Sequence, residues 1–129
     1  MNSPSILGSS KLIAFAITTN PARTIEFYGG TLGLQFVSQD NFAVVFVCNG
    51  NMLRLAITQK FTPPKHTVVG WEVSNIEKVV AELVKAGVKF NHYGFPTQDE
   101  QGIWTTPDGS KVAWFEDPDG NVLSVSQHD

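Results

Sequence analysis

The stretch that decides the fold is FEDPDGNVLSVSQ, residues 115–127. Residues 117–120 form a turn, because the proline presets φ at the first corner and the glycine supplies the left-handed residue that ends it. Apolar alternation on both sides of the turn indicates two strands, so we predict a β-hairpin. The expected register has two cross-strand pairs, Phe115 with Leu123 on one face and Trp114 with Ser124 on the other.

A second hairpin is predicted over residues 43–55, around Asn49-Gly50. Asn-Gly is a strong signal for a two-residue turn, because both residues accept a positive φ. This turn pairs Phe46 with Leu53, and Val45 with Arg54. Each hairpin therefore has an aromatic–leucine pair on one face and a different pair on the other, which indicates an internal repeat.

The repeat extends upstream of both hairpins. Asn20 and Asn75 each follow an apolar, strand-like run and provide the side chain that caps the start of a helix. We expect the first helix to begin at Pro21, to run to about Tyr28 and to stop at Gly29-Gly30. The other expected elements are strands at Lys11–Thr19, Leu34–Gln39, Thr67–Val73 and Val88–Tyr93, and a helix at Ile76–Ala86.

These elements divide the chain into two modules with the order β-α-β-β-β. We predict a loose N-terminal tail at residues 1–10, a first module at 11–58, a linker at 59–66 and a second module at 67–127, all in one structural domain. The second module is longer than the first, because it has a longer loop between Asn91 and Gly109.

The composition is that of an ordinary globular protein, with 42% hydrophobic and 16% charged residues. A net charge of −3 does not favour a nucleic-acid partner, which needs a basic surface. No apolar run approaches the roughly 18 residues of a membrane span, and residues 1–10 lack the basic start and apolar run of a signal peptide. The single cysteine, Cys48, excludes an internal disulfide and favours a reducing, cytoplasmic location.

Several short motifs, in this order, resemble those of the vicinal oxygen chelate superfamily, which includes glyoxalase I, extradiol dioxygenases, and fosfomycin and bleomycin resistance proteins. They are Phe27-Tyr28, Leu32-Gly33-Leu34, Ala86-Gly87-Val88 and Asp117-Pro118-Asp119-Gly120-Asn121. The resemblance covers Lys11 to Gln127. It implies an α+β fold in which two βαβββ modules form an open, cupped β-sheet, with the helices on the outside and the ligand or metal in the cup. This fold hosts several functions, so the site residues must decide between them.

Enzymes of this superfamily hold a divalent metal on the first and last strands of each module, usually through His, Gln or Glu. The resemblance places the four positions at Ile13, Arg54, Val68 and Ser124. Two of these residues have no donor atom, one is a cation, and one is a weak neutral ligand. We therefore predict no metal and no cofactor.

Strand alternation identifies the residues that would face the cup. Five of them are predicted to bind a ligand: Phe15, Arg54, Glu72, Trp114 and Ser124. The aromatic rings offer flat apolar contact, and an arginine in an apolar hollow requires an anionic partner. Two alternatives stay open: Phe15 and Trp114 fill a closed core, or Arg54 forms an internal ion pair with Glu72.

These observations favour a metal-independent small-molecule-binding protein that sequesters or senses a small, partly aromatic compound with an acidic or electron-rich group. No catalytic residue is assigned. One alternative is a lyase, isomerase or dioxygenase of the same superfamily, with a non-standard metal site or with Glu72 as a base. Another is a structural dimer with a filled cup. Exposed sheet edges predict a homodimer, and the linker would permit the exchange of modules.

Overall fold

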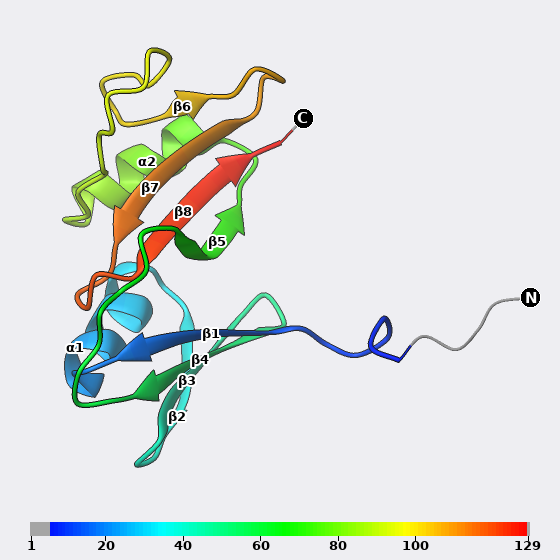
Figure 1. Ribbon diagram of the computed structural model, residues 1–129, viewed down its shortest axis with the longest axis vertical. Coiled ribbons are helices and arrows are strands. Elements are labelled where there is room, and N and C mark those ends of the chain that lie inside the picture. Colours follow the sequence, from blue (N-terminus) through cyan, green and yellow to red (C-terminus); the bar gives the residue numbers. More distant parts are fainter. Residues whose placement is uncertain (1–5, 129) are drawn as a thin grey trace, which may run out of the picture.

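The computed structural model describes residues 6–128 and contains two four-stranded sheets, with strand orders β1-β4-β3-β2 and β5-β8-β7-β6 (Figure 1). The strands are β1 (Ile13–Thr18), β2 (Gln35–Gln39), β3 (Ala43–Cys48), β4 (Asn51–Ile57), β5 (Thr67–Glu72), β6 (Trp104–Thr105), β7 (Lys111–Glu116) and β8 (Val122–Gln127). We call residues 13–57 module one and residues 67–127 module two. Each has the βαβββ order, so the predicted α+β fold class is confirmed.

Of the predicted N-terminal tail, residues 1–5 lie outside the described residues, and residues 6–10 form exposed bends and turns. No helix in the described part of the chain is long and apolar enough to cross a membrane.

Both predicted hairpins are confirmed, with the predicted registers. In the turn between β3 and β4, Asn49 and Gly50 have φ angles of 49° and 80°, the positive values that a two-residue hairpin turn requires. In the turn between β7 and β8, Gly120 has a φ of 87°. The turn residues and the alternation were therefore sufficient to fix both pairings.

The first helix differs from its predicted form. It begins at the predicted cap, where the Asn20 side chain accepts a backbone hydrogen bond, and α1 covers Pro21–Thr24. It then continues as a π-helical segment, η1 (Ile25–Thr31), so the predicted stop at Gly29-Gly30 is wrong. Glycines have no Cβ and adopt the wider turn without steric cost. Tyr28, which lies in this segment, is fully buried.

Module two has no strand at Val88–Tyr93, so this part of the prediction is wrong. After α2 (Ile76–Lys85), Phe90 makes only an isolated bridge to β7. The chain leaves the sheet because the Gln98 side chain takes backbone groups that a strand would pair. It accepts from the backbone N–H of Tyr93 at 2.8 Å and donates to the carbonyl of Asn91 at 2.9 Å. The fourth position in the sheet belongs to β6 instead.

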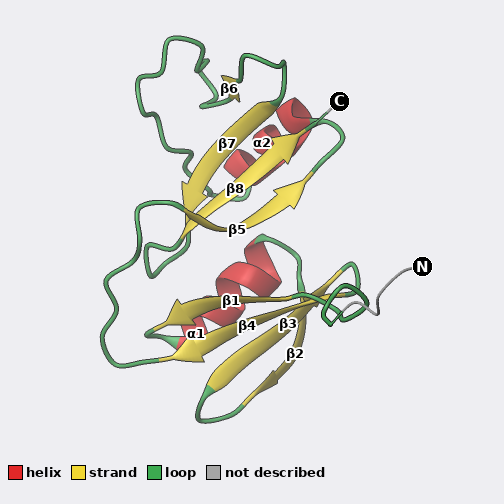
Figure 2. Ribbon diagram, turned by 45° about the vertical axis from the view of Figure 1, so that its right-hand side comes forward, coloured by secondary structure: helices red, strands yellow, loops and turns green. Residues whose placement is uncertain are grey.

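The two modules share one hydrophobic core, and the turn at residues 117–120 joins them. Here Asp117 Oδ2 accepts a hydrogen bond from the Tyr28 hydroxyl at 2.6 Å, and Asn121 Nδ2 donates to the carbonyl of Ile17 at 2.8 Å. Figure 2 shows that each helix lies behind the sheet of its own module. The front face of both sheets is therefore left uncovered by helices.

Burial changes the acidity of Tyr28 and Asp117, whose hydrogen bond joins the modules. Burial, and then the negative charge of Asp117, hold the pKa of the Tyr28 hydroxyl well above its usual value. Burial also raises the pKa of Asp117, against the opposing effect of its hydrogen bonds to Tyr28 and Asn121. The phenol consequently stays protonated, as its hydrogen bond to the carboxylate requires.

Candidate ligand-binding site

Four aromatic side chains of module two form a continuous cluster, which we call the aromatic wall: Tyr93, Phe95, Trp104 and Trp114. Trp114 on β7 is its centre, and the ring centroids of Tyr93, Phe95 and Trp104 lie 5.5, 6.0 and 5.9 Å from its own. Trp104 stacks on Trp114 at an interplanar angle of 29°, whereas Tyr93 meets it edge-on at 69°. Tyr93 and Phe95 are 48% and 40% exposed, so the wall presents open ring surface.

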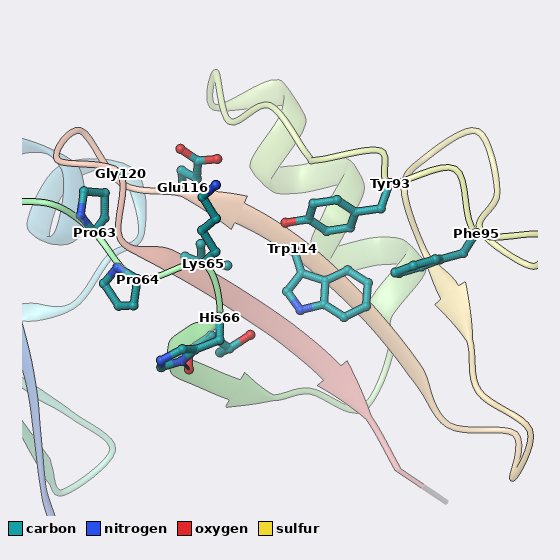
Figure 3. A pocket seen from close by; sticks show the side chains of 11 residues that line it. Pro63, Pro64, Lys65, His66, Tyr93, Phe95, Trp114, Glu116 and Gly120 are labelled. Carbon is teal, nitrogen blue, oxygen red and sulfur yellow. Dashed lines mark hydrogen bonds between the residues drawn. The ribbon is translucent and has the colours of Figure 1, made fainter.

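The aromatic wall borders a cavity of about 650 Å³, which we call the aromatic slot. Figure 3 shows Pro63 and Pro64 of the linker on one side of this cavity, and Tyr93, Phe95 and Trp114 on the other. The slot is therefore built between module two and the segment that connects the modules. A cavity of this size suits a drug-sized molecule.

The linker is held at the slot by direct packing on the hairpin turn. A Cβ atom added to Gly120 would lie 3.0 Å from Cγ of Pro63, closer than side chains normally approach. Gly120 therefore serves two purposes: it adopts the positive φ of the turn, and it leaves room for the proline.

The loop that follows α2 holds the aromatic wall in place. At its centre, the Gln98 amide nitrogen donates to the carbonyls of Asn91 and Gly102, both at 2.9 Å. Further along, the Thr97 hydroxyl donates to the carbonyl of Thr105 at 2.8 Å. These bonds tie the two ends of the loop together and bring its aromatic residues against β7.

Polar groups gather at one end of the slot. Asn91 Nδ2 donates to the hydroxyl oxygen of Tyr93 at 3.0 Å and to Glu116 Oε2 at 3.3 Å. Lys65 and His66 of the linker also line the cavity. In Figure 3 the Tyr93 hydroxyl points toward the side where Glu116 and Lys65 lie. The slot thus combines flat apolar surface with a few polar groups, as small-molecule sites do.

The structure separates the five residues that were predicted to bind a ligand. Trp114 lines the aromatic slot. Ser124 lies opposite Trp114 in the sheet but is buried, and its Oγ lies 2.9 Å from the point where a Cβ on Gly70 would stand. Its hydroxyl therefore fills the space beside this glycine. Glu72 lines a different groove, of about 540 Å³, which residues of both modules border.

Phe15 and Arg54 lie on the other sheet, opposite each other on β1 and β4. Phe15 is 62% exposed, so it does not fill a closed core. Arg54 is half-buried, with its Nη1 atom 3.9 Å from the sulfur of Met52. Neither side chain lines the aromatic slot.

The alternative ion pair between Arg54 and Glu72 is not formed. Within residues 6–128, the ion pair with an N–O distance of 4 Å or less joins Lys111 to Glu77, at 2.7 Å. The charge of Arg54 acts instead on Asp40, whose pKa is lowered mainly by two backbone hydrogen bonds and to a smaller extent by Arg54.

Sequence reasoning missed Tyr93, Phe95 and the linker as parts of a site. It assigned Tyr93 to the end of a strand at Val88–Tyr93, placed a long loop between Asn91 and Gly109, and treated residues 59–66 as a linker. Residues 91–109 contain three large aromatic side chains, Tyr93, Phe95 and Trp104. Their presence was the one signal that could have identified this part of the site, because large rings in a loop pack on an apolar surface. The linker carried no comparable signal.

The four positions at which superfamily enzymes hold a metal do not fit one here. Ile13 and Val68 have no donor atom, Arg54 repels a cation, and Ser124 is a weak neutral ligand. Across residues 6–128, no three His, Cys, Asp or Glu side chains are grouped so that they could hold a metal ion.

The sequence pattern of the Glyoxalase/Bleomycin resistance protein/Dioxygenase superfamily matches residues 12–125. The chain therefore belongs to this superfamily, as its motifs indicated. A comparison with curated protein sequences finds no significant match.

Solved structures with the same fold include proteins with different described roles. The antibiotic-binding protein TnmS3 from Streptomyces sp. CB03234 has a TM-score of 0.73 at 18% identity, with 97% of this chain and 100% of that chain covered. Lactoylglutathione lyase from Agrobacterium tumefaciens has a TM-score of 0.71 at 16% identity, with 92% and 93% covered. A superfamily member from Sphaerobacter thermophilus DSM 20745 has a TM-score of 0.70 at 22% identity, with 93% and 98% covered. At these identities the likeness shows the fold alone.

Proposed function

We propose that this protein is a metal-independent small-molecule-binding protein that sequesters or senses a small, partly aromatic compound. The observation that carries the proposal is the aromatic wall, which presents open ring surface to a cavity of about 650 Å³. Aromatic surface exposed to water favours a partner that covers it, and a flat ligand gains stacking of about 0.5–1.5 kcal/mol per ring beyond burial. A structural relative described as an antibiotic-binding protein supports the same reading.

A cation at the slot supports a ligand with an acidic or electron-rich group. Lys65 lines the slot. Arg54, on the other sheet, is half-buried and has no ion-pair partner within residues 6–128. A half-buried guanidinium without an ion-pair partner favours an anionic or electron-rich ligand.

The side chains at the four superfamily metal positions favour binding over metal-dependent catalysis. The superfamily metal positions of this chain carry no suitable ligand set, so the proposal includes no metal and no cofactor. One structural relative is described as a lyase. The residue predicted as a base for an enzyme of that kind, Glu72, lies outside the aromatic slot.

We also propose a homodimer in a reducing cytoplasm. The uncovered face of module one exposes Ile13 by 43% and Phe15 by 62%, an apolar surface that a second copy would bury. Within one chain, Phe15 and Arg54 lie on a different sheet from the slot, so only a second copy could bring such residues to it. The single cysteine, Cys48, is half-buried and free, in keeping with a reducing compartment.

The proposal is tested by binding of 9-anthracenecarboxylate, a flat aromatic acid, with cyclohexanecarboxylate as the non-aromatic acid for comparison. We expect isothermal titration calorimetry to show saturable binding of the aromatic acid only. Trp114→Leu should weaken binding by about tenfold or more, because it removes the central ring of the wall. The matched control is Trp71→Phe, which changes a tryptophan that stacks on Phe115 outside the slot.

Elemental analysis of the same sample, purified without chelators, should find well under one divalent metal ion per chain. Binding that Trp114→Leu leaves unchanged in a folded variant would overturn the proposed site. Near-stoichiometric metal would overturn metal independence.

A further inference from the structure

We propose that Asn91, Tyr93 and Glu116 select a flat ligand whose edge carries a hydrogen-bond acceptor directly beside a donor, as a cyclic amide does. This inference rests on the proposed binding function, because it specifies the chemistry of the ligand that the aromatic slot takes. It follows from how three side chains share their hydrogen bonds at the polar end of the slot.

The amide of Asn91 is the bridge between the other two residues. Its nitrogen carries two hydrogens and donates to the Tyr93 hydroxyl oxygen at 3.0 Å and to Glu116 Oε2 at 3.3 Å. Both acceptors therefore lie next to the same nitrogen atom. The backbone of Asn91 is fixed as well, since its N–H donates to the carbonyl of Trp114 at 2.7 Å and its carbonyl accepts from Gln98 at 2.9 Å.

This sharing leaves one donor and one acceptor for a ligand. The Tyr93 oxygen accepts from Asn91, so its own hydrogen is left to donate. Glu116 uses Oε2 for Asn91, and its Oε1 has no hydrogen-bond partner among residues 6–128. A phenol donor and a carboxylate acceptor therefore both line the slot, each within hydrogen-bond distance of the Asn91 amide nitrogen.

The complementary ligand edge has an acceptor for Tyr93 and a donor for Glu116. The flat body of such a ligand would lie against the aromatic wall while its edge meets the two groups. A ligand that lacks the donor would cover the Glu116 carboxylate without replacing its contact with water, which weakens binding. Asn91 acts as a positioning residue, because it holds both groups but has no remaining hydrogen to donate.

The test compares three small flat probes: 2-quinolone, N-methyl-2-quinolone and quinoline. 2-Quinolone has a carbonyl beside an N–H, its N-methyl derivative keeps the carbonyl and loses the donor, and quinoline has neither group. Binding is followed by the indole N–H signal of Trp114 in NMR titrations, with the signal of Trp71 as an internal control. We expect 2-quinolone to bind about tenfold more tightly than N-methyl-2-quinolone.

Two variants test separately how Glu116 and Tyr93 contribute to the preference for 2-quinolone. Glu116→Leu should remove the preference for 2-quinolone over its N-methyl derivative, because only 2-quinolone donates to the carboxylate. Tyr93→Phe should weaken both quinolones equally and keep their ratio, because both offer the carbonyl. The control is Glu26→Leu, an exposed glutamate in module one, which should change neither value. A thermal melt of each variant confirms that it is folded.

The outcomes separate the inference from the proposed function. Equal affinities for the two quinolones, or a preference that Glu116→Leu leaves intact, would overturn the donor–acceptor assignment while aromatic binding stands. The same holds if 9-anthracenecarboxylate binds and no quinolone does. If neither the quinolones nor 9-anthracenecarboxylate shifts the Trp114 signal, the proposed function itself is wrong.

Discussion

The hydroxyl of Tyr28, in the π-helical segment of module one, donates to Oδ2 of Asp117, in the hairpin turn of module two, at 2.6 Å. The same carboxylate accepts from the side-chain and backbone nitrogens of Asn121, at 2.7 and 2.9 Å. A second aspartate of the turn, Asp119, accepts from the backbone N–H of Thr19 at 2.9 Å. The turn that closes one module is thus also the surface against which the other module is held.

Tyr28→Phe should lower the free energy of unfolding by about 1–3 kcal/mol, because it leaves a buried carboxylate oxygen with one donor fewer. The control is Tyr93→Phe, which removes the hydroxyl of a residue that is 48% exposed and should cost about 0.5 kcal/mol or less. Urea unfolding of the three proteins measures both values. Equal losses for the two variants would contradict a special role for the Tyr28 bond.

Wild-type stability should fall more steeply at alkaline pH than that of Tyr28→Phe. The folded pKa of Tyr28 is raised above its unfolded value of about 10, so above that pH the unfolded chain releases a proton that the folded chain keeps. The unfolding free energy then decreases by up to about 1.4 kcal/mol per pH unit for this group. Unfolding curves between pH 9 and pH 11 should show the advantage of the wild type shrinking. Parallel curves would mean that Tyr28 titrates as it does in the unfolded chain.

Gly120→Ala should cost more than Gly109→Ala. Both glycines have a similar positive φ, 87° and 90°, so both substitutions carry a similar backbone cost. A Cβ at Gly109 meets nothing within 4 Å, whereas one at Gly120 meets Pro63 at 3.0 Å. We expect an additional loss of about 1–3 kcal/mol at position 120, the usual range for overpacking. Equal losses in thermal or urea unfolding would show that the linker moves away freely.

Arg54→Leu should change stability by about 1 kcal/mol or less, because no buried partner is left unpaired. In a double-mutant cycle with Glu72→Leu, the coupling energy should be below about 0.5 kcal/mol. A coupling of several kcal/mol, with recovery of stability in the double variant, would place these two residues in a buried ion pair.

Sedimentation equilibrium should show a species of twice the chain mass of 14.1 kDa at micromolar concentration. Phe15→Ser should shift the distribution toward the monomer, because it removes an exposed ring from the uncovered face of module one. Phe42→Ser is the matched control, since Phe42 is 77% exposed but lies between β2 and β3. Observation of only the monomer in the wild type would refute the dimer.

Sequence reasoning succeeded where a local rule determines the structure. The caps at Asn20 and Asn75, the Asn49-Gly50 turn and the register around Trp114 each depend on a few neighbouring residues with narrow backbone preferences. It failed where distant contacts compete with local preference. Gly29-Gly30 would normally end a helix, but burial of Tyr28 accompanies a π-helical continuation through both glycines.

The candidate site was harder to predict than the fold for the same reason. Strand alternation identified Trp114, because β7 is regular. It could not identify Tyr93, which follows a segment that looks like a strand and whose backbone N–H donates to the side chain of Gln98. The linker was equally hidden, since its contact with Gly120 joins residues far apart in the sequence.

The slot draws two of its sides from segments that interrupt the symmetry of the repeat. The linker at residues 59–66 and the long loop before β6 each occur once, whereas the sheets and hairpins occur twice. Duplication of a module therefore could not have produced this cavity by itself. The sheets and hairpins, which are repeated, form the framework of both modules. The linker and the long loop, which are not repeated, make one half of the molecule different from the other. Substitutions in these two segments can therefore reshape the slot while the sheets and hairpins of the two modules stay the same.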